Sequence, residues 1–333
     1  MSARPDGSGE DHLIAKYFCP LARHPGALGL MDDAAIFTPP EGCDLVLTKD
    51  AIVEGVHFFA EDPAGAIARK ALRVNLSDLA AKGAAPAGFL LALALPESVS
   101  PKWLQDFADS LGQDAETYGC PLLGGDTVKS PGPVMISVTA FGVLPRGRMV
   151  RRSGANGGDL VFVTGTIGDA ALGLRMRKET AGRERWDLDE AMRDHLASRY
   201  LLPQPRNALA EAVRTHASAA MDVSDGLAGD LEKLCRASGV GAVIEVSRLP
   251  LSPAGQAVLA ADARAIETIL TGGDDYEIVC AIAPARAASF QAAARKAGVT
   301  ISEIGRIAEG EGASFIAADG KALNFARTSF SHF

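Results

Sequence analysis

The segment Met221-Asp222-Val223-Ser224-Asp225-Gly226-Leu227 joins a run of small residues to a predicted helix. It places two carboxylates and a hydroxyl within one short turn. Asp225 can cap the helix that starts near Leu227, with Gly226 in the turn. That interpretation leaves Asp222 and Ser224 without a role. The alternative is a site in which carboxylate and hydroxyl oxygens hold a metal ion or a phosphate.

Aspartates recur in five further short segments, most of them beside an apolar stretch. Carboxylates repel one another at close range, so their convergence in the fold requires a cation. Hard divalent ions prefer oxygen ligands, and Mg²⁺ usually arrives with phosphates. The five segments are Met31-Asp32-Asp33-Ala34, Thr48-Lys49-Asp50, Asn75-Leu76-Ser77-Asp78, Gly124-Gly125-Asp126-Thr127 and Gly272-Gly273-Asp274-Asp275-Tyr276-Glu277.

Length and composition indicate a globular chain of two domains. The 333 residues are too many for one typical core, and 47% of them are hydrophobic. The formal net charge of −8 argues against nucleic acid and anionic membranes as partners. An acidic protein can still bind phosphates where metal ions mediate.

Cysteine usage and the N-terminus indicate a cytoplasmic protein. The five cysteines are scattered and form no C-x-x-C pair, which is typical of reduced, buried thiols. Residues 1–10 are polar and glycine-rich, without the apolar core of a secretory signal. No apolar run is long enough to span a bilayer, so we expect no membrane partner.

The order of strands and helices predicts an α/β or α+β class for each half of the chain. We expect a disordered tail over 1–10, an N-terminal domain over 11–148 and a C-terminal domain over 149–333. We expect an exposed connection over 178–189. Strands are predicted at 44–48, 87–95, 134–143, 159–163, 241–246, 277–282 and 300–307, and helices at 63–82, 101–118, 170–178, 205–216, 226–237 and 284–297.

Nucleotide binding, if present, does not use a familiar fingerprint. The chain contains no G-x-x-x-x-G-K-[ST], and no G-x-G-x-x-G opens a helix after the first strand. Gly124-Gly125-Asp126 is either a tight turn or a place where backbone N–H groups and a carboxylate meet a phosphate–metal cluster. Arg151 and Arg152 are either a solvated basic patch or bidentate phosphate contacts. His57, beside Phe58 and Phe59, is either a core residue or a substrate contact.

Eight segments, in the same order and spacing, give the chain a resemblance to the thiamine-monophosphate kinase family of the PurM-like (aminoimidazole ribonucleotide synthetase-like) superfamily. The closing Phe330-Ser331-His332-Phe333 is also similar. The eight segments are Asp32–Ala35, Thr48–Asp50 with Gly55–Phe58, Lys70–Ala81, Gly124–Thr127, Arg152–Gly154, Val163–Gly168, Met221–Leu227 and Gly272–Glu277.

The resemblance implies a two-domain PurM-like fold and ATP-dependent phosphorylation of thiamine monophosphate to thiamine diphosphate. It implies several Mg²⁺ ions and a homodimer whose N-terminal domains pair into a β-barrel, followed by a C-terminal α/β domain. The acceptor is already a phosphate, so we expect direct in-line transfer of the γ-phosphoryl group, with no protein residue acting as nucleophile or base.

The resemblance also assigns roles to individual residues. Metal ligands are expected at Asp33, Thr48, Lys49, Asp50, Asp78, Asp126, Asp222 and Asp225. ATP contacts are expected at Tyr118, Gly125, Asp126, Arg152 and Ser224. Substrate contacts are expected at His57, Asp274 and Phe325.

Three positions depart from the family pattern. Met31 replaces a glycine before the Asp32-Asp33 pair, Lys49 stands where threonine is usual, and Asp274 stands where glutamate is common. At Lys49 only the backbone carbonyl can ligate a metal.

Two alternatives remain. One is another PurM-like ATP-dependent enzyme, such as a selenophosphate synthetase, although the reactive N-terminal cysteine of such enzymes has no counterpart here. The other is a non-catalytic dimer that binds ATP or thiamine phosphate.

Overall fold

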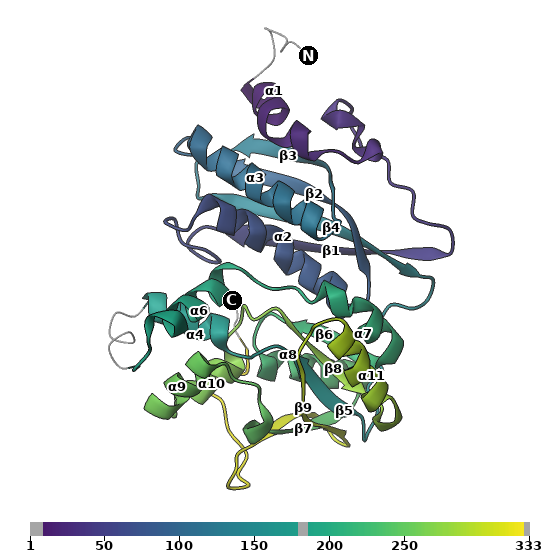
Figure 1. The fold of residues 1–333 in the computed structure, drawn as a ribbon, viewed down its shortest axis with the longest axis vertical. Helices are drawn as coiled ribbons and strands as arrows, with labels where there is room; N and C mark the ends of the chain where they lie inside the picture. The colour runs from purple at the N-terminus through teal and green to yellow at the C-terminus, as the bar shows by residue number, and fades with distance from the viewer. Residues whose placement is uncertain (1–8, 179–185, 330–333) are drawn as a thin grey trace. The chain divides into compact units, whose positions relative to one another are not determined.

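The computed structural model describes residues 9–178 and 186–329, and it divides them into two compact units. The first unit runs through Leu76 and resumes from Pro86 to Arg146. The second consists of Ser77–Ala85 and the chain from Gly147 onward. Each unit is a mixed α/β structure around its own sheet (Figure 1), so the predicted two-domain α/β class is confirmed. Of the tail expected over 1–10, only Gly9 and Glu10 are described, and they open helix α1.

The first unit is built on a four-stranded sheet in the order β1-β4-β2-β3. Strands β1 and β4 pair antiparallel, and β2 and β3 pair parallel. The strands are β1 Cys43–Val53, β2 Ala85–Leu95, β3 Leu122–Lys129 and β4 Met135–Pro145. The helices are α1 Gly9–Leu13, α2 Ala64–Ala81 and α3 Pro101–Thr117, with a π-helix at Ile14–Phe18 and 3-10 helices at Cys19–Leu21 and Pro25–Leu30.

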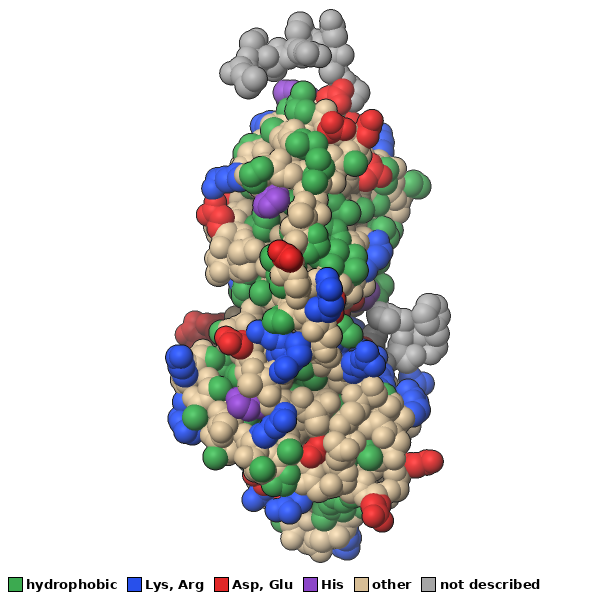
Figure 2. Space-filling view, turned by 90° about the vertical axis from the view of Figure 1, so that its right-hand side faces the viewer, with side chains coloured by type: hydrophobic (Ala, Val, Ile, Leu, Met, Phe, Trp, Pro, Cys, Tyr) green, Lys and Arg blue, Asp and Glu red, His purple; other side chains and the backbone are tan. Residues whose placement is uncertain are grey.

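One face of this sheet is buried and the other is open. Helices α2 and α3 cover the buried face (Figure 1). The Ser100 hydroxyl caps α3 by accepting from the Trp103 N–H at 3.1 Å, as the sequence predicts. On the other face Leu47 is 61% exposed and Val128 is 49% exposed. Hydrophobic side chains are visible at the surface of the first unit (Figure 2).

The second unit has a six-stranded sheet in the order β10-β7-β9-β5-β8-β6. The strands are β5 Leu160–Thr164, β6 Ala217–Val223, β7 Gly241–Glu245, β8 Glu277–Ile282, β9 Ile301–Ala308 and β10 Gly312–Ile316. The helices are α4 Asp169–Lys178, α6 Glu190–Leu201, α7 Ala210–His216, α8 Leu227–Ser238, α9 Pro253–Ala261, α10 Ala265–Thr271 and α11 Pro284–Lys296, with 3-10 helices at Asn207–Leu209 and Val246–Arg248.

Helices pack on both faces of this second sheet, which explains the continuous apolar runs of β5 and β8. Phe162 of β5 faces a core shared with α7 and α11, while its neighbour Val163 faces the core under α4, α8 and α10. Every residue of β8 is buried. A strand buried on both faces loses the alternating pattern, so its apolar run is unbroken.

Two expectations about the chain's course are wrong. The strand expected over 44–48 is longer: β1 continues to Val53, so Asp50 lies within the strand and not beyond its end. The connection expected to be exposed over 178–189 contains Trp186 and Leu188, which are 2% and 5% exposed. Arg175 of α4 lies over the Trp186 ring at 5.5 Å, so this aromatic side chain packs against the helix before it. Residues 179–185 of that connection lie outside the described residues.

No helix within the described ranges is long and apolar enough to cross a membrane.

The close approach of α4 and α6 depends on Gly173. A Cβ atom at this position would lie 2.1 Å from the Leu196 carbonyl oxygen, a backbone atom that cannot move aside alone. We therefore expect Gly173→Ala to lower the free energy of unfolding by about 1–3 kcal/mol, the usual cost of overpacking. Chemical denaturation measures this, with Gly157→Ala as the control because no atom lies within 4 Å of its added Cβ. Equal stability of the two variants would contradict the packing described.

Candidate functional site

A cavity of about 800 Å³ opens on the uncovered face of the first unit's sheet. Its polar lining comes from the loop before β1, from β1 itself, from β3 and from β4. It brings together four of the predicted site residues: Asp33, Lys49, Gly125 and Asp126. The Lys49 ammonium thus shares a cavity with carboxylates, which reduces the negative charge available there to a metal ion.

Gly124-Gly125-Asp126 lies within strand β3 and is not a tight turn. Gly125 pairs with Leu91 of β2, and a Cβ at Gly125 would lie 2.0 Å from the Leu91 carbonyl oxygen. Only glycine fits this close approach between the two strands. Asp126 follows on an exposed part of the strand and faces solvent at the cavity.

The replacement at Met31 does not disturb the turn before Asp33. Met31 has φ −104°, a conformation open to any residue. The left-handed conformations lie one to three residues earlier, at Leu28, Gly29 and Leu30. Met31 itself is 83% exposed, so its side chain does not pack in the core.

Thr48 and Asp50 are half-buried, whereas Lys49 between them is exposed on the cavity side. Successive side chains of a strand point to opposite faces, so Thr48 and Asp50 point away from the cavity face. The Asp50 backbone is fixed from both directions: its N–H donates to Asn75 Oδ1 at 3.1 Å, and its carbonyl accepts from Ser137 Oγ at 3.1 Å.

His57 and Tyr118 also lie in the first unit but do not line the cavity. The His57 Nδ1 accepts from the Val53 N–H at 3.1 Å, so in the neutral ring Nε2 carries the proton. Tyr118 ends helix α3, with the Arg73 guanidinium 5.7 Å from its ring centroid.

The second unit contains a group of interacting buried carboxylates at the end of β6. Asp222 is 5% exposed and Asp230 is fully buried. Burial raises the pKa of Asp222 well above its ordinary value, and the nearby charges of Asp78 and Asp230 raise it further. The Ser77 hydroxyl and the Lys82 ammonium act in the opposite direction. Asp78 and Asp222, far apart in sequence, are therefore electrostatic neighbours, as the metal-site hypothesis requires.

Asp230 was not among the predicted site residues, yet it organises the turn after β6. Its Oδ2 accepts from the N–H groups of Ser224 and Asp225, both at 2.9 Å. Lys233 bridges Asp225 at 2.6 Å and Asp230 at 2.8 Å. In sequence Asp230 resembles an ordinary acidic residue in the first turn of a helix, which hides this role.

Lys82 supplies a positive charge beside this group. Its Nζ donates to the Ala220 carbonyl at 2.7 Å. Burial, with a smaller contribution from the charge of Arg152, lowers the pKa of Lys82 from 10.5 to about 8, against the opposing influence of Asp222 and Asp78. Arg152, a predicted ATP contact, is thus close enough to Lys82 to interact electrostatically.

The two predicted substrate contacts of the second unit, Asp274 and Phe325, lie in environments that differ from each other. Asp274 is half-buried, and its Oδ1 accepts from the Tyr276 hydroxyl at 3.3 Å. Phe325 is half-buried against the main core, with its ring 5.6 Å from that of Phe315 in an edge-on arrangement. The similar C-terminal segment 330–333 lies outside the described residues.

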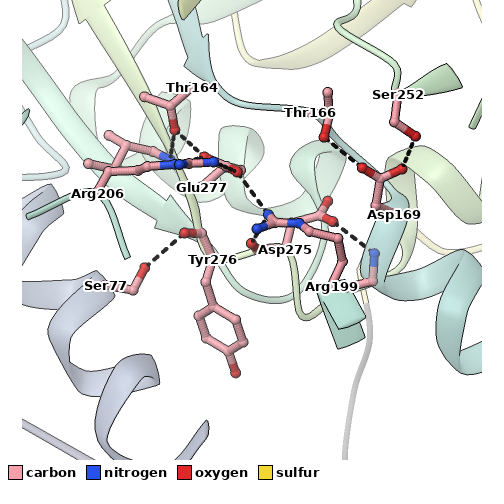
Figure 3. A network of polar contacts seen from close by, with 12 residues as sticks. Ser77, Thr164, Thr166, Asp169, Arg199, Arg206, Ser252, Asp275, Tyr276 and Glu277 are labelled. Carbon is pink, nitrogen blue, oxygen red and sulfur yellow. Dashed lines mark hydrogen bonds and ion pairs between the residues drawn. The ribbon is translucent and has the colours of Figure 1, made fainter. Parts of the chain in front are cut away.

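The segment Gly272–Glu277 is anchored by a polar network that the sequence did not reveal (Figure 3). The Glu277 carboxylate accepts from Thr164 Oγ1 at 2.6 Å and from Arg206 Nε at 2.6 Å. Arg199 Nη2 donates to the same carboxylate at 2.8 Å. Glu277 is completely buried, so these donors compensate a charge that would otherwise be costly.

The oxygen donors of both units fit Mg²⁺ in chemical type. Within the described residues no three His, Cys, Asp or Glu side chains form a preformed cluster that could hold a metal ion. Mg²⁺ commonly uses one or two carboxylates and completes its shell with water and phosphate oxygens. The charge of Asp78 helps to raise the pKa of Asp222. A bound cation would offset this repulsion between the two carboxylates.

Comparison with known domain families identifies the class. Residues 31–144 match the family described as AIR synthase related protein, N-terminal domain, and residues 156–317 match its C-terminal domain. Together with the two α/β units, these matches define a two-domain protein related to AIR synthase.

Comparison with individual proteins defines the family more narrowly than the domain matches do. The chain is 47% identical over 91% of its length to the thiamine-monophosphate kinase of Caulobacter vibrioides, covering 85% of that protein. A solved thiamine-monophosphate kinase from Stenotrophomonas maltophilia superposes with a TM-score of 0.82 at 39% identity, covering 94% of this chain and 96% of the other. A structure described as AaThiL complexed with AMPPCP and TMP gives a TM-score of 0.76 at 32% identity, covering 92% of this chain and 97% of the other. The chain belongs to the thiamine-monophosphate kinase family, so the resemblance seen in the sequence is confirmed.

The lowered pKa of Lys82 has a measurable consequence for stability. The unfolded chain holds the Lys82 proton up to pH 10.5, whereas the folded protein releases it near pH 8. The unfolded state therefore binds more protons in this window, and stability rises with pH across it. We expect the free energy of unfolding of the wild type, minus that of Lys82→Met, to increase by up to about 3 kcal/mol between these pH values.

Denaturant unfolding with a chelator present measures this difference, and subtracting the variant removes the titration of other groups. A difference that stays flat over the window would mean that Lys82 is not desolvated.

Proposed function

We propose that this chain catalyses the ATP-dependent phosphorylation of thiamine monophosphate to thiamine diphosphate, with Mg²⁺ as the metal. The observation that carries the proposal is 47% identity over 91% of the chain to a thiamine-monophosphate kinase. A structural relative described with AMPPCP and TMP, which is 32% identical, supports the same pair of substrates.

The reaction needs positioning more than a reactive side chain. The acceptor is a phosphate monoester whose oxygen is itself the nucleophile, so transfer of the γ-phosphoryl group requires no protein nucleophile and no strict general base. When bound, Mg²⁺ neutralises phosphate oxygens and helps to hold donor and acceptor in line. The chain's contribution is to fix its carboxylates and donors before the substrates arrive.

Each unit supplies its own part of this machinery. In the first unit, Asp33 and Asp126 at the cavity are proposed metal ligands, with the Gly125 backbone beside them as an ATP contact. Thr48 and Asp50 are retained as proposed ligands, although their side chains point away from the cavity face in this structure. For Lys49 the proposed ligand is its carbonyl oxygen. Tyr118 is proposed as an ATP contact and His57 as a substrate contact.

In the second unit, the buried Asp222 with Asp78 is the strongest candidate for a metal site. Asp225 is the further ligand, and it must exchange its ion pair with Lys233 for a metal. Arg152 and Ser224 are proposed to contact ATP. Asp274 and Phe325 are proposed to contact thiamine monophosphate.

We also propose that the active form is a homodimer joined through the first unit. Leu45 and Leu47 alternate along β1 on the uncovered face of its sheet, and Val128 of β3 is exposed at the opposite edge. Exposed apolar side chains gathered on one face of a sheet are typical of an interface. A second copy of the same sheet would cover them and close a β-barrel.

A non-catalytic protein that binds ATP or thiamine phosphate is the second candidate, favoured by the Lys49 ammonium in the cavity lined by Asp33 and Asp126. An assay with ATP, Mg²⁺ and thiamine monophosphate separates the two functions. Binding of both substrates without formation of thiamine diphosphate would favour the binding protein.

Asp126→Asn tests the metal assignment in the first unit. Asp126 is exposed in β3 and has no role in the core, so the fold should be retained. Loss of one electrostatic contact to the reacting groups should lower kcat by at least about 100-fold. Steady-state kinetics measures kcat, and circular dichroism serves as the folding control. Wild-type kcat in a folded variant would remove Asp126 from the site.

Lys49→Thr tests the effect of the extra cation. Removing the ammonium from the carboxylate-lined cavity should strengthen Mg²⁺ binding, because like charges repel. We expect the Mg²⁺ concentration that gives half-maximal activity to fall, with Lys129→Thr, at the far end of β3, as the control for a change in net charge. An unchanged or higher Mg²⁺ requirement would show that Lys49 does not act on the metal.

A further inference from the structure

The segment Gly272–Glu277 passes through the left-handed region at two residues that are not glycine. Asp274 has φ +73° and Tyr276 has φ +51°. Aspartate tolerates this conformation, but it is a genuine outlier for a residue as bulky as tyrosine. Strained conformations persist where the surrounding structure holds them, and they concentrate at functional sites.

The backbone of this segment is held on one side by the end of β6. The Asp274 N–H donates to the Ser224 carbonyl, and the Tyr276 N–H donates to the Val223 carbonyl, both at 2.8 Å. These bonds tie the segment to the same turn that carries Asp222 and Asp225. They fix the backbone at Asp274 and at Tyr276, so the intervening Asp275 faces the opposite direction.

Asp275 anchors the other side. Its Oδ2 accepts from the Gly168 N–H at 2.7 Å, at the start of α4. Its carbonyl accepts from Arg199 Nη2 at 3.2 Å, and the same nitrogen donates to Glu277 Oε1 at 2.8 Å. One nitrogen of Arg199 therefore holds the residues immediately before and after Tyr276.

Arg199 helps to compensate the buried charge of Glu277, but its own burial is also costly. It is only 4% exposed, yet its Nε and Nη1 have no hydrogen-bond partner within the described residues. Leaving buried donors of a charged group unsatisfied is costly. Among the described residues, the hydrogen bonds that this guanidinium makes end on the Gly272–Glu277 segment. A costly residue whose bonds converge on one strained loop is best explained by what that loop does.

The anchoring separates the segment into two sides. Asp275 and Glu277 are fully buried and point into the network, whereas Asp274 and Tyr276 are half-buried. Figure 3 shows the Tyr276 ring directed away from Arg199 and Glu277. The Tyr276 hydroxyl lies 3.3 Å from Asp274 Oδ1, so these two side chains form a single surface.

We propose that Arg199 is a positioning residue for the thiamine-phosphate subsite: it holds the Asp275 carbonyl and the Glu277 carboxylate so that Asp274 and Tyr276 are presented together to the substrate. Arg199 itself does not touch the substrate. This inference rests on the proposed function, in which Asp274 contacts thiamine monophosphate, and it adds Tyr276 to that surface.

The test compares Arg199→Met and Arg199→Lys with wild type and with Asp159→Asn. Methionine keeps the length of the side chain and removes its donors, while lysine keeps one charged donor group. Asp159 is a matched structural control, because it is also 4% exposed and its carboxylate accepts from Ser218 Oγ at 2.5 Å. It directly precedes β5, whereas Thr164 of the Glu277 network ends that strand. Steady-state kinetics is combined with hydrogen exchange of peptides that cover residues 272–277, measured without substrates.

We expect Arg199→Met to raise KM for thiamine monophosphate at least about tenfold, since misplaced substrate contacts are costly, while KM for ATP is nearly unchanged. Arg199→Lys should recover part of this loss. Hydrogen exchange over 272–277 should be faster in Arg199→Met than in Asp159→Asn, even where both variants lose a similar amount of thermal stability.

Two results would overturn the inference. One is unchanged KM values and exchange rates in both Arg199 variants, and the other is an equal rise in KM for both substrates. If Arg199→Met does not fold, Arg199→Lys decides by the same criteria. A wild-type enzyme without turnover on thiamine monophosphate overturns the proposed function, and the inference with it. Wild-type turnover with no selective effect in the variants overturns the inference alone.

Discussion

Mutual repulsion among buried carboxylates is the constraint on which the second unit depends. Asp222 lies buried within the electrostatic reach of Asp78 and Asp230, and both burial and these neighbours raise its pKa. Lys82 and Lys233 offset only part of this repulsion. A fold that required stability alone would have little reason to keep such a group. The arrangement is understandable if a divalent cation and phosphates complete it, as the proposed kinase reaction requires.

In both units, close packing or buried hydrogen bonds fix the backbone next to the proposed site residues. Gly125 allows β3 to approach β2 so closely that a methyl group would not fit, and Asp126 follows directly. In the second unit, Arg199 and Glu277 fix a strained loop from inside the core. Each unit thus carries its polar residues on strands or on loops anchored to strands, which favours preorganisation over adjustment on binding.

The sequence predicted the local motifs well and the long-range partners poorly. The turn Asp222–Gly226 was recognisable because its polar residues are adjacent, and strand β8 was predicted with its observed limits. Asp230 was missed because a first-turn aspartate is ordinary in a helix. Arg199 was missed because its acceptors lie more than seventy residues away. Asp50 was misplaced because nothing local marks where β1 ends, and Trp186 was expected to be exposed because its neighbours are charged.

The thermal stability of Asp222→Asn, measured at pH 8 without metal and again with Mg²⁺ and a non-hydrolysable ATP analogue, tests the central claim most directly. The raised pKa of Asp222 means that the folded state binds this proton more tightly than the unfolded state, so stability is lost as pH rises above 3.8. The neutral amide should therefore raise the melting temperature of the metal-free protein and reduce the further rise produced by Mg²⁺ and the analogue. A lower metal-free melting temperature with an undiminished response to Mg²⁺ and the analogue would contradict the account.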